Sequence, residues 1–383
     1  MTDELLKWRS EFPILERKTH LISHSLGAMP RRARDRAKEF LDLWDEQGIV
    51  AWNTWLPYVT KLGDLVGSVI GADPGTIVMN QNVSTVQWIV SSCLDFKGPR
   101  RRVVYSDLNF HTVNYVWQEQ ARRRGAELVI VPSKDGIHPP TEEILAAIDE
   151  RTAIVPISHV IFRSSAVKDV RAITKKAHEV GALVLLDCYQ STGTVPFSVK
   201  DLGVDFACGG SVKWICGGPG AAYLYVRPDR MKQFEPMLTG WFAHKRPFAF
   251  EMGPIDYADD VWRYSGGTPA MPALYTAHAG WEIVASIGVD RIREKSLRMT
   301  RRMMQRADEM GFRVNTPRED SKRGGTVCID FDGAEVVSRE LIRRGILLDY
   351  RPKCGIRASP HFYTTDEEVE RLFEEIEKIR SAA

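Results

Sequence analysis

The sequence lacks the features of several specialised classes of protein. No apolar stretch approaches the roughly 18 residues that a membrane-spanning helix needs, so no membrane span is expected. The 52 lysine and arginine residues are almost balanced by 50 aspartate and glutamate residues, which argues against nucleic acid as a main partner. The first ten residues are polar and charged, unlike a secretory signal peptide. We therefore expect a globular protein with neither membrane nor nucleic-acid partners.

Cysteine is also scarce. The six positions are Cys93, Cys188, Cys208, Cys216, Cys328 and Cys354. They form no CxxC pair and no cluster with histidine, which argues against a structural zinc site or any other metal. Several of them lie in apolar runs and are expected to be buried thiols, as in a reducing compartment such as the cytoplasm.

No repeat or low-complexity tract interrupts the chain, and β-rich segments alternate with amphipathic ones. Strands are predicted at 77–79, 103–106, 127–131, 153–158, 183–187, 205–208 and 221–226, and helices at 83–95, 111–124, 141–149 and 169–180. This alternation predicts an α/β fold with a large, mostly parallel sheet covered by helices on both faces. The continuous apolar run at 182–186 fits a strand that is buried on both sides.

The pattern changes after about residue 270. One long helical pattern covers 271–309, followed by strands at 326–331, 345–349 and 355–359 and helices at 336–344 and 366–380. The last helix begins with Thr365 and Glu368, a combination that caps helix starts. We expect an N-terminal arm (1–28), a large domain (29–276) and a small α+β domain (277–383). The loop-rich segment 232–268 is long for a connection, which is typical of functional or interface loops.

Two residues occupy positions that suit catalysis. The apolar strand at 183–187 ends in Asp187, and ligands of such sheets bind at the carboxyl ends of the strands. Lys213 follows 26 residues later, just before a glycine-rich turn. The pair suits pyridoxal phosphate, because a buried lysine can form a Schiff base with its aldehyde and a carboxylate can keep its pyridine nitrogen protonated. On this spacing alone, an ordinary strand-end aspartate and a surface lysine remain open.

A phosphate site is predicted where the first of these strands meets its helix. Asn82, Ser84 and Thr85 follow the strand at 77–79 and open the next helix. Hydroxyl groups at a helix N-terminus, together with its free N–H groups, can bind phosphate. A simple helix cap explains the same residues equally well.

Motifs along nearly the whole chain resemble the class V aminotransferase superfamily of fold-type I pyridoxal-phosphate enzymes, and kynureninases most. The similar segments are His24–Gly27 (NSLG in the family), Asn109–Thr112 (NFPT), Ser158–Arg163 (THVNYR), Asp187–Ser191 (DLAHS), Ser211–Trp214 (TYKY), the glycines of 217–220, Gly240–His244 (GWFGH), Gly267–Pro269 (GTxP) and Gly355–Ser359. The resemblance implies a homodimer with shared active sites, an amino acid substrate and pyridoxal phosphate as cofactor.

The resemblance also implies a role for each matching residue. Lys213 is expected to hold the cofactor as an aldimine and to move a proton at the substrate α-carbon. Asp187 is expected at the pyridine nitrogen, and Arg357 at the substrate carboxylate through a two-pronged guanidinium contact. The further expected contacts are Ser84, Thr85, Phe110, Gln190 and Ser211 to the cofactor, Trp241 and Thr268 to the cofactor of the neighbouring subunit, and His244 and Arg246 to the substrate.

The implied reaction is a kynureninase-like hydrolysis of the Cβ–Cγ bond of kynurenine or a related amino acid. The chain departs from that pattern at four positions: Val113 replaces an aspartate, Ile161 an asparagine, Gln190 a histidine and Val212 a tyrosine. Since these changes remove polar groups around cofactor and substrate, an aminotransferase or a β-eliminating C–S lyase on the same scaffold is the alternative.

Two further interpretations are less favoured. A cysteine desulfurase needs a nucleophilic cysteine on a loop, but Cys354 lies only three residues before Arg357, so we interpret it as structural. A non-catalytic binding protein is disfavoured because Lys213, Asp187 and Arg357 are all present.

Overall fold

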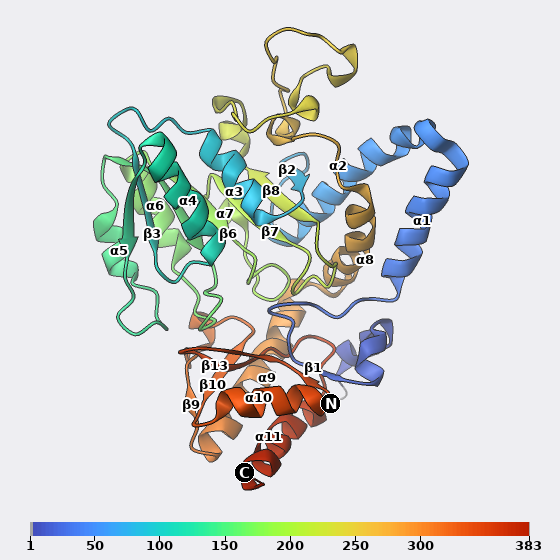
Figure 1. The fold of residues 1–383 in the computed structure, drawn as a ribbon, viewed down its shortest axis with the longest axis vertical. Helices are drawn as coiled ribbons and strands as arrows, with labels where there is room; N and C mark the ends of the chain where they lie inside the picture. Colours follow the sequence, from blue (N-terminus) through green and yellow to red (C-terminus); the bar gives the residue numbers. More distant parts are fainter. Residues whose placement is uncertain (1–2, 383) are drawn as a thin grey trace.

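A seven-stranded sheet forms the centre of the computed structural model, which describes residues 3–382 (Figure 1). Its order is β2-β8-β7-β6-β5-β3-β4. The strands are β2 (Ile77–Asn80), β3 (Arg102–Ser106), β4 (Glu127–Val131), β5 (Thr152–Ser158), β6 (Leu183–Asp187), β7 (Phe206–Gly210) and β8 (Ala222–Val226). Only β8 runs against its neighbours, so the sheet is mostly parallel, and all seven predicted strands are confirmed.

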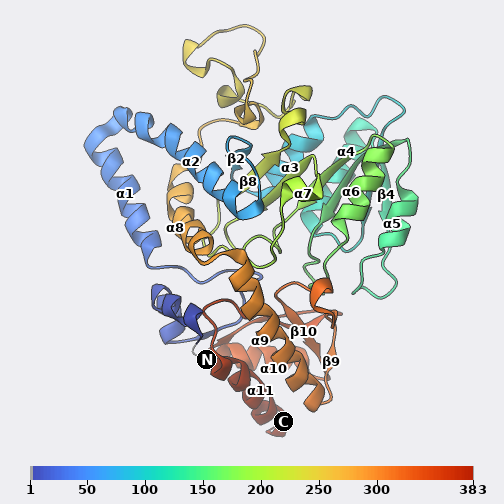
Figure 2. The same cartoon turned by 180° about the vertical axis from the view of Figure 1, so that it is seen from behind.

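Helices cover both faces of this sheet, as the alternating pattern predicted (Figures 1 and 2). One face is covered by α3 (Val83–Ser92) and α4 (His111–Arg124). The other is covered by α2 (Trp52–Ile70), α5 (Thr141–Ala147), α6 (Val170–Glu179), α7 (Val199–Leu202) and α8 (Met271–Ile287), with α1 (Arg32–Gln47) packed on α8. Along β6, Leu185 packs on the first side and Val184 and Leu186 on the second, because side chains alternate along a strand.

The C-terminal part contains a second, antiparallel sheet of order β12-β13-β10-β9. Its strands are β9 (Arg313–Val314), β10 (Val327–Asp330), β12 (Asp349–Arg351) and β13 (Gly355–Ala358), and its helices are α9 (Val289–Glu309), α10 (Ala334–Arg343) and α11 (Asp366–Ser381). The predicted capping box of Thr365 and Glu368 starts α11. The expected boundary after residue 276 falls inside α8, and residues 1–2 and 383 lie outside the described part.

The single long helix predicted at 271–309 is wrong. The chain forms two helices, α8 and α9, that meet at Gly288. Gly288 has a φ of +86°, a conformation that glycine adopts without steric cost and that ends the first helix. The apolar pattern continues through this break because both helices bury one face, so the pattern alone concealed the turn.

The N-terminal segment joins the two parts of the molecule. Its β1 (Thr19–His20) pairs with β11 (Ile346–Leu347) of the C-terminal part, and Arg9 forms an ion pair with Glu368 at 2.8 Å. In Figure 1 this dark blue segment, with its short 3-10 helices Glu4–Glu11 and Pro13–Glu16, lies beside the red α11. The chain then passes the end of β7, where the amide of Gly27 donates to the carbonyl of Val212 at 2.9 Å.

A loop-rich segment projects from the opposite end, drawn in yellow at the top of Figure 1. It contains four 3-10 helices: Pro228–Gln233, Trp241–Ala243, Pro247–Ala249 and Val261–Tyr264. Large apolar side chains are exposed along it, namely Met237, Leu238, Trp241, Phe248, Phe250, Met252 and Ile255. In residues 3–382, no helix combines the length and the apolar character needed to cross a membrane.

Candidate active site

A cavity of about 250 Å³ opens where β5, β6 and β7 end. The loop after each strand and the N-terminal ends of α3 and α4 surround it. Its lining residues are Asn82, Val83, Ser84, Phe110, Thr112, Ser158, Val160, Phe162, Asp187, Tyr189, Gln190, Val212 and Lys213. Five of the residues expected at the cofactor or in catalysis therefore share one cavity: Ser84, Phe110, Asp187, Gln190 and Lys213.

Lys213 reaches this cavity from the loop after β7. Its Nζ lies 4.7 Å from the ring centroid of Tyr189 and 5.4 Å from that of Phe110. Burial lowers the pKa of Lys213 from its usual 10.5 to about 8; the Asp187 charge opposes this shift and the Arg357 charge adds to it. The amine is therefore available in its neutral, nucleophilic form near physiological pH.

Asp187 faces the same cavity from the end of β6. The amide of Tyr189 donates to its Oδ1 at 2.9 Å. Burial raises the pKa of Asp187, while that amide and the nearby Lys213 and Lys168 charges favour its ionised form. This carboxylate can accept a hydrogen bond from a protonated ring nitrogen bound in the cavity.

The N-terminus of α3 presents hydroxyl groups to the cavity, although a different residue caps the helix. The side chain of Asn82 is the cap and accepts from the amide of Thr85 at 2.9 Å. Ser84 Oγ lies 3.2 Å from the hydroxyl of Thr112, a residue that sequence reasoning did not single out. Asn82 thus satisfies the backbone and leaves Ser84 free to face a ligand.

Thr85 and Thr268 lie together in a second cavity of about 210 Å³ beside the first. Its other walls come from the end of β2 and from the Gly266–Ala270 turn. Ser211 is fully buried and donates to the carbonyl of Gly218 at 2.7 Å, outside the lining of the Lys213 cavity. None of these three residues therefore lines the Lys213 cavity of its own chain.

The residues expected from the projecting loop lie elsewhere in the single chain. His244 lines a third cavity of about 390 Å³ with Phe242, Phe248 and Trp262. Arg246 is exposed and pairs with Glu251 at 2.9 Å. Trp241 is exposed, and its indole donates to the carbonyl of Pro247. None of these residues lines the Lys213 cavity of its own chain.

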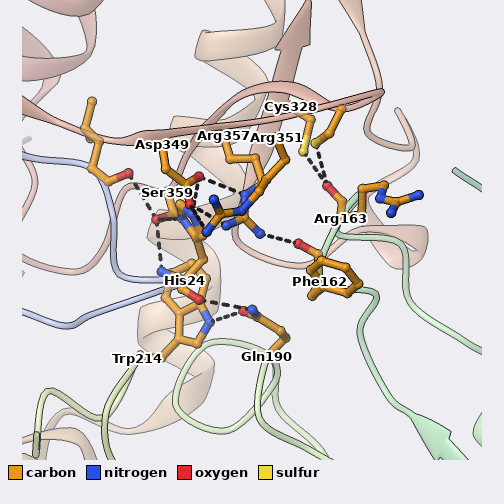
Figure 3. A network of polar contacts seen from close by, with 12 residues as sticks. His24, Phe162, Arg163, Gln190, Trp214, Cys328, Asp349, Arg351, Arg357 and Ser359 are labelled. Atoms are coloured by element: carbon orange, nitrogen blue, oxygen red, sulfur yellow. Dashed lines mark hydrogen bonds and ion pairs between the residues drawn. The ribbon is translucent and has the colours of Figure 1, made fainter. Parts of the chain in front are cut away.

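Arg357 is buried next to the cavity, and some of its N–H groups already donate to a neighbouring carboxylate (Figure 3). Its Nε and Nη2 donate to the two oxygens of Asp349 at 2.8 and 2.6 Å. Its Nη1 donates to the carbonyl of Phe162, a cavity residue, at 2.7 Å. Asp349 is the main residue that sequence reasoning missed, and it orients the group proposed to bind substrate.

A hydrogen-bonded network extends from this ion pair to Trp214, which follows Lys213 in the loop after β7, called here the lysine loop (Figure 3). His24 contacts Asp349 at 3.0 Å and Ser359 at 2.7 Å. Burial and the Arg357 charge lower the pKa of His24 to about 4, so its imidazole is neutral at pH 7. Gln190 donates to the carbonyl of His24 at 3.0 Å and accepts from the indole of Trp214 at 3.1 Å. Gln190 therefore connects the N-terminal segment to the residue after Lys213.

Three other cavity residues were not predicted individually, although the segments that contain them were recognised. Tyr189, Phe162 and Thr112 each lie in a segment that resembles a family motif. Their contribution depends on which side chains turn into the cavity, and the motifs alone do not give that orientation.

We expect Gly27→Ala to disturb the lysine loop, because a Cβ at Gly27 would lie 2.2 Å from the carbonyl oxygen of Lys213 and 2.8 Å from Cys216 Sγ. Overpacking of this kind costs about 1–3 kcal/mol. Chemical denaturation should show that loss, with weaker cofactor retention. Gly98→Ala, where a Cβ meets open space, is the control. Equal stability of both variants would contradict the prediction.

The fold and the pairing of a buried lysine with a sheet-edge carboxylate are those of pyridoxal-phosphate-dependent enzymes. The chain belongs to the class-V aminotransferase family, whose family model matches residues 58–372. It is 32% identical to a kynureninase of Bacillus thuringiensis subsp. konkukian over 96% of this chain and 89% of that one. It is also 32% identical to a kynureninase of Pseudomonas fluorescens over 96% and 90% of the two chains. The expected family is therefore confirmed.

Solved structures confirm the expected fold. An apo cysteine desulfurase from Thermococcus onnurineus superimposes with a TM-score of 0.89 at 22% identity, covering 100% of this chain and 99% of the other. The cystine C-S lyase C-DES superimposes with a TM-score of 0.87 at 21% identity, covering 95% and 98%. At these identities the likeness concerns the fold alone.

The groups around the Lys213 cavity fit pyridoxal phosphate. A reactive amine and a carboxylate face one space, which suits the aldehyde and the ring nitrogen of one cofactor molecule. Phe110 offers a flat apolar face, and the hydroxyl of Ser84 at the N-terminus of α3 suits a phosphate. Among the described residues there is no cluster of metal-binding side chains.

Proposed function

We propose that this protein is a kynureninase-like hydrolase. The substrate is kynurenine or a related amino acid with a γ-carbonyl group. Water adds to that carbonyl, the Cβ–Cγ bond breaks, and the products are alanine and an aromatic acid. The observation that carries the proposal is the similarity to kynureninases over almost the whole chain, together with the Lys213 and Asp187 cavity.

Each residue has a defined task in this proposal. Lys213 holds the cofactor and moves a proton at the substrate α-carbon. Asp187 keeps the pyridine nitrogen protonated, and the bound ring then accepts the electron pair released at that carbon. Phe110 stacks on the ring, while Gln190, Ser84, Thr85 and Ser211 support the ring and phosphate. Arg357 binds the α-carboxylate with the N–H groups that Asp349 and the carbonyl of Phe162 leave free.

The projecting loop supports a homodimer with shared active sites. Trp241, Thr268, His244 and Arg246 do not line the Lys213 cavity of their own chain. We assign Trp241 and Thr268 to the cofactor site of the neighbouring subunit, and His244 and Arg246 to its substrate. The exposed apolar side chains of this loop fit a protein interface. All six cysteines are free thiols, which supports a reducing compartment such as the cytoplasm.

A β-eliminating C–S lyase or an aminotransferase on the same scaffold is the second candidate. Val160, Phe162 and Val212 contribute apolar side chains to the lining of the cavity, and the neighbouring Ile161 is buried. In the kynureninase pattern, an asparagine stands in place of Ile161 and a tyrosine in place of Val212. The loss of those groups is the observation that favours a different amino acid side chain.

Product analysis distinguishes these reactions. The purified holoenzyme is incubated with kynurenine, 3-hydroxykynurenine, cysteine and cystine, and the products are separated. Alanine with an aromatic acid in stoichiometric amounts supports hydrolysis. A keto acid without sulfide or persulfide, formed as the cofactor changes to its pyridoxamine form, indicates transamination, and release of sulfide or persulfide indicates C–S cleavage. Either result would overturn the hydrolase proposal, and Lys213→Ala serves as the inactive control.

A further inference from the structure

A second lysine is buried beside the active site without an acidic partner. Lys168 lies between β5 and α6 and is 2% exposed. Within residues 3–382 it forms no ion pair; its Nζ donates to Ser106 Oγ at 3.0 Å and to Asn109 Oδ1 at 2.8 Å. Burying an unpaired amine costs free energy, which the hydrogen bonds to Ser106 and Asn109 offset only in part.

Lys168 does not face the cavity itself. It is not among the residues that line the Lys213 cavity, so it does not compete with Lys213 for the cofactor. Burial lowers the pKa of Lys168 to about 7, against the opposing charges of Asp187 and Asp107. An amine donates hydrogen bonds in both its neutral and its protonated form, so the contacts to Ser106 and Asn109 persist on both sides of pH 7.

Asn109 is the residue through which Lys168 reaches the site. Its Oδ1 accepts from Lys168 and from the amide of Ser158 at 3.2 Å, and its Nδ2 donates to the carbonyl of Pro156 at 2.8 Å. These bonds attach the loop after β3 to the last residues of β5. Phe110 follows Asn109 directly, begins the entry into α4 and lines the cavity.

The contacts of Lys168 also fix the neighbouring strand ends. Its amide donates to the carbonyl of His159 at 2.9 Å, and the amide of His159 donates to the carbonyl of Asp187 at 2.9 Å. In the sheet, Ser158 is the register partner of Asp187. The loop that carries Phe110 is thus held against the strand end that carries Asp187.

We propose that Lys168 is a positioning residue for the cofactor site: through Asn109 it holds Phe110 in place across the cavity from Lys213. The inference uses the assignment of pyridoxal phosphate but not the identity of the amino acid substrate. It therefore stands or falls independently of the kynureninase-like reaction.

The test measures binding of pyridoxal phosphate to the apoenzyme, followed by the absorbance of the lysine-bound cofactor. Lys168→Met keeps the length of the side chain and removes its donors. We expect the half-saturating cofactor concentration to rise about 10-fold. Lys175→Met, on the exposed side of α6, is the matched control and should leave binding unchanged.

A double-mutant cycle with Phe110→Leu separates positioning from a general loss of stability. Loss of an aromatic contact weakens binding by roughly 2- to 13-fold. If Lys168 acts through Phe110, the double variant binds no more weakly than the weaker single variant. Multiplicative effects of the two substitutions, or wild-type binding by Lys168→Met, would overturn the proposal.

A milder variant covers the case in which Lys168→Met fails to fold. Ser106→Ala removes one of the two acceptors of Lys168 and leaves the lysine in place. We expect about a 3-fold rise in the half-saturating cofactor concentration, again absent in the Phe110→Leu background. An equal rise in both backgrounds would contradict the route through Phe110.

Discussion

Lys213→Ala is expected to abolish the absorbance of the lysine-bound cofactor and to lower turnover by about 10²- to 10⁴-fold, the loss typical of a missing general acid–base group. The amine of Lys213 faces the cavity between Tyr189 and Phe110, and among residues 3–382 no other lysine lines that cavity. Borohydride treatment followed by peptide mapping should mark Lys213 in the wild-type protein.

The matched control for this prediction is Lys168→Met. Both lysines are buried and have lowered pKa values, but only Lys213 lines the cavity. At saturating pyridoxal phosphate, Lys168→Met should retain the absorbance band. A band that survives in Lys213→Ala and disappears in Lys168→Met would show that Lys168, and not Lys213, binds the cofactor.

The pH dependence of cofactor uptake follows from the pKa of Lys213. Only the neutral amine attacks an aldehyde, and a pKa near 8 in place of 10.5 raises its neutral fraction at pH 7 about 300-fold. The uptake rate should rise about tenfold per pH unit below pH 8 and level off above it. Stopped-flow absorbance of the apoenzyme measures this rate. A rate that still climbs steadily up to pH 10 would contradict the lowered pKa.

The sequence predicted the central sheet well because its strands are short, nearly continuous apolar runs, and the inner strands are buried on both faces, whereas the edge strand β4 is partly exposed. It also paired Asp187 with Lys213, which are far apart along the chain. They meet because β6 and β7 are adjacent parallel strands, with Asp187 in register with Cys208, so both strands end at the same edge. The rule that ligands bind at this edge was sufficient.

Other features depend on geometry that local patterns do not encode. Ser84 and Thr85 are adjacent in sequence, but successive side chains of a helix point about 100° apart, so they face different cavities. Asp349 meets Arg357 because β12 and β13 pair antiparallel in a register that places these residues opposite each other. A one-residue shift of that register would separate them. The sequence therefore predicted the arginine but not the carboxylate that orients it.

Arg357→Met is expected to lose both substrate binding and stability. Arg357 and Asp349 form a two-pronged ion pair in a site where their side chains are 4% and 15% exposed. Removing one partner of a buried pair costs about 3–5 kcal/mol. The low end of that range is expected, because His24 and Arg351 still contact Asp349 at 3.0 Å each. Chemical denaturation measures this loss, and KM should rise about 100-fold, since hydrogen bonds to a charged group contribute roughly 1.5–3 kcal/mol.

The double variant Arg357→Met/Asp349→Leu separates the two effects. Replacing a buried ion pair by apolar side chains of similar volume is often neutral for stability, so most of the lost free energy of unfolding should return. Substrate binding should not return, because Asp349 only orients the guanidinium group and the substrate carboxylate needs the group itself. A double variant with a wild-type KM would show that Arg357 serves the fold alone. A single variant with unchanged stability and raised KM would instead show that Asp349 needs no partner, so the ion pair would be part of substrate binding only.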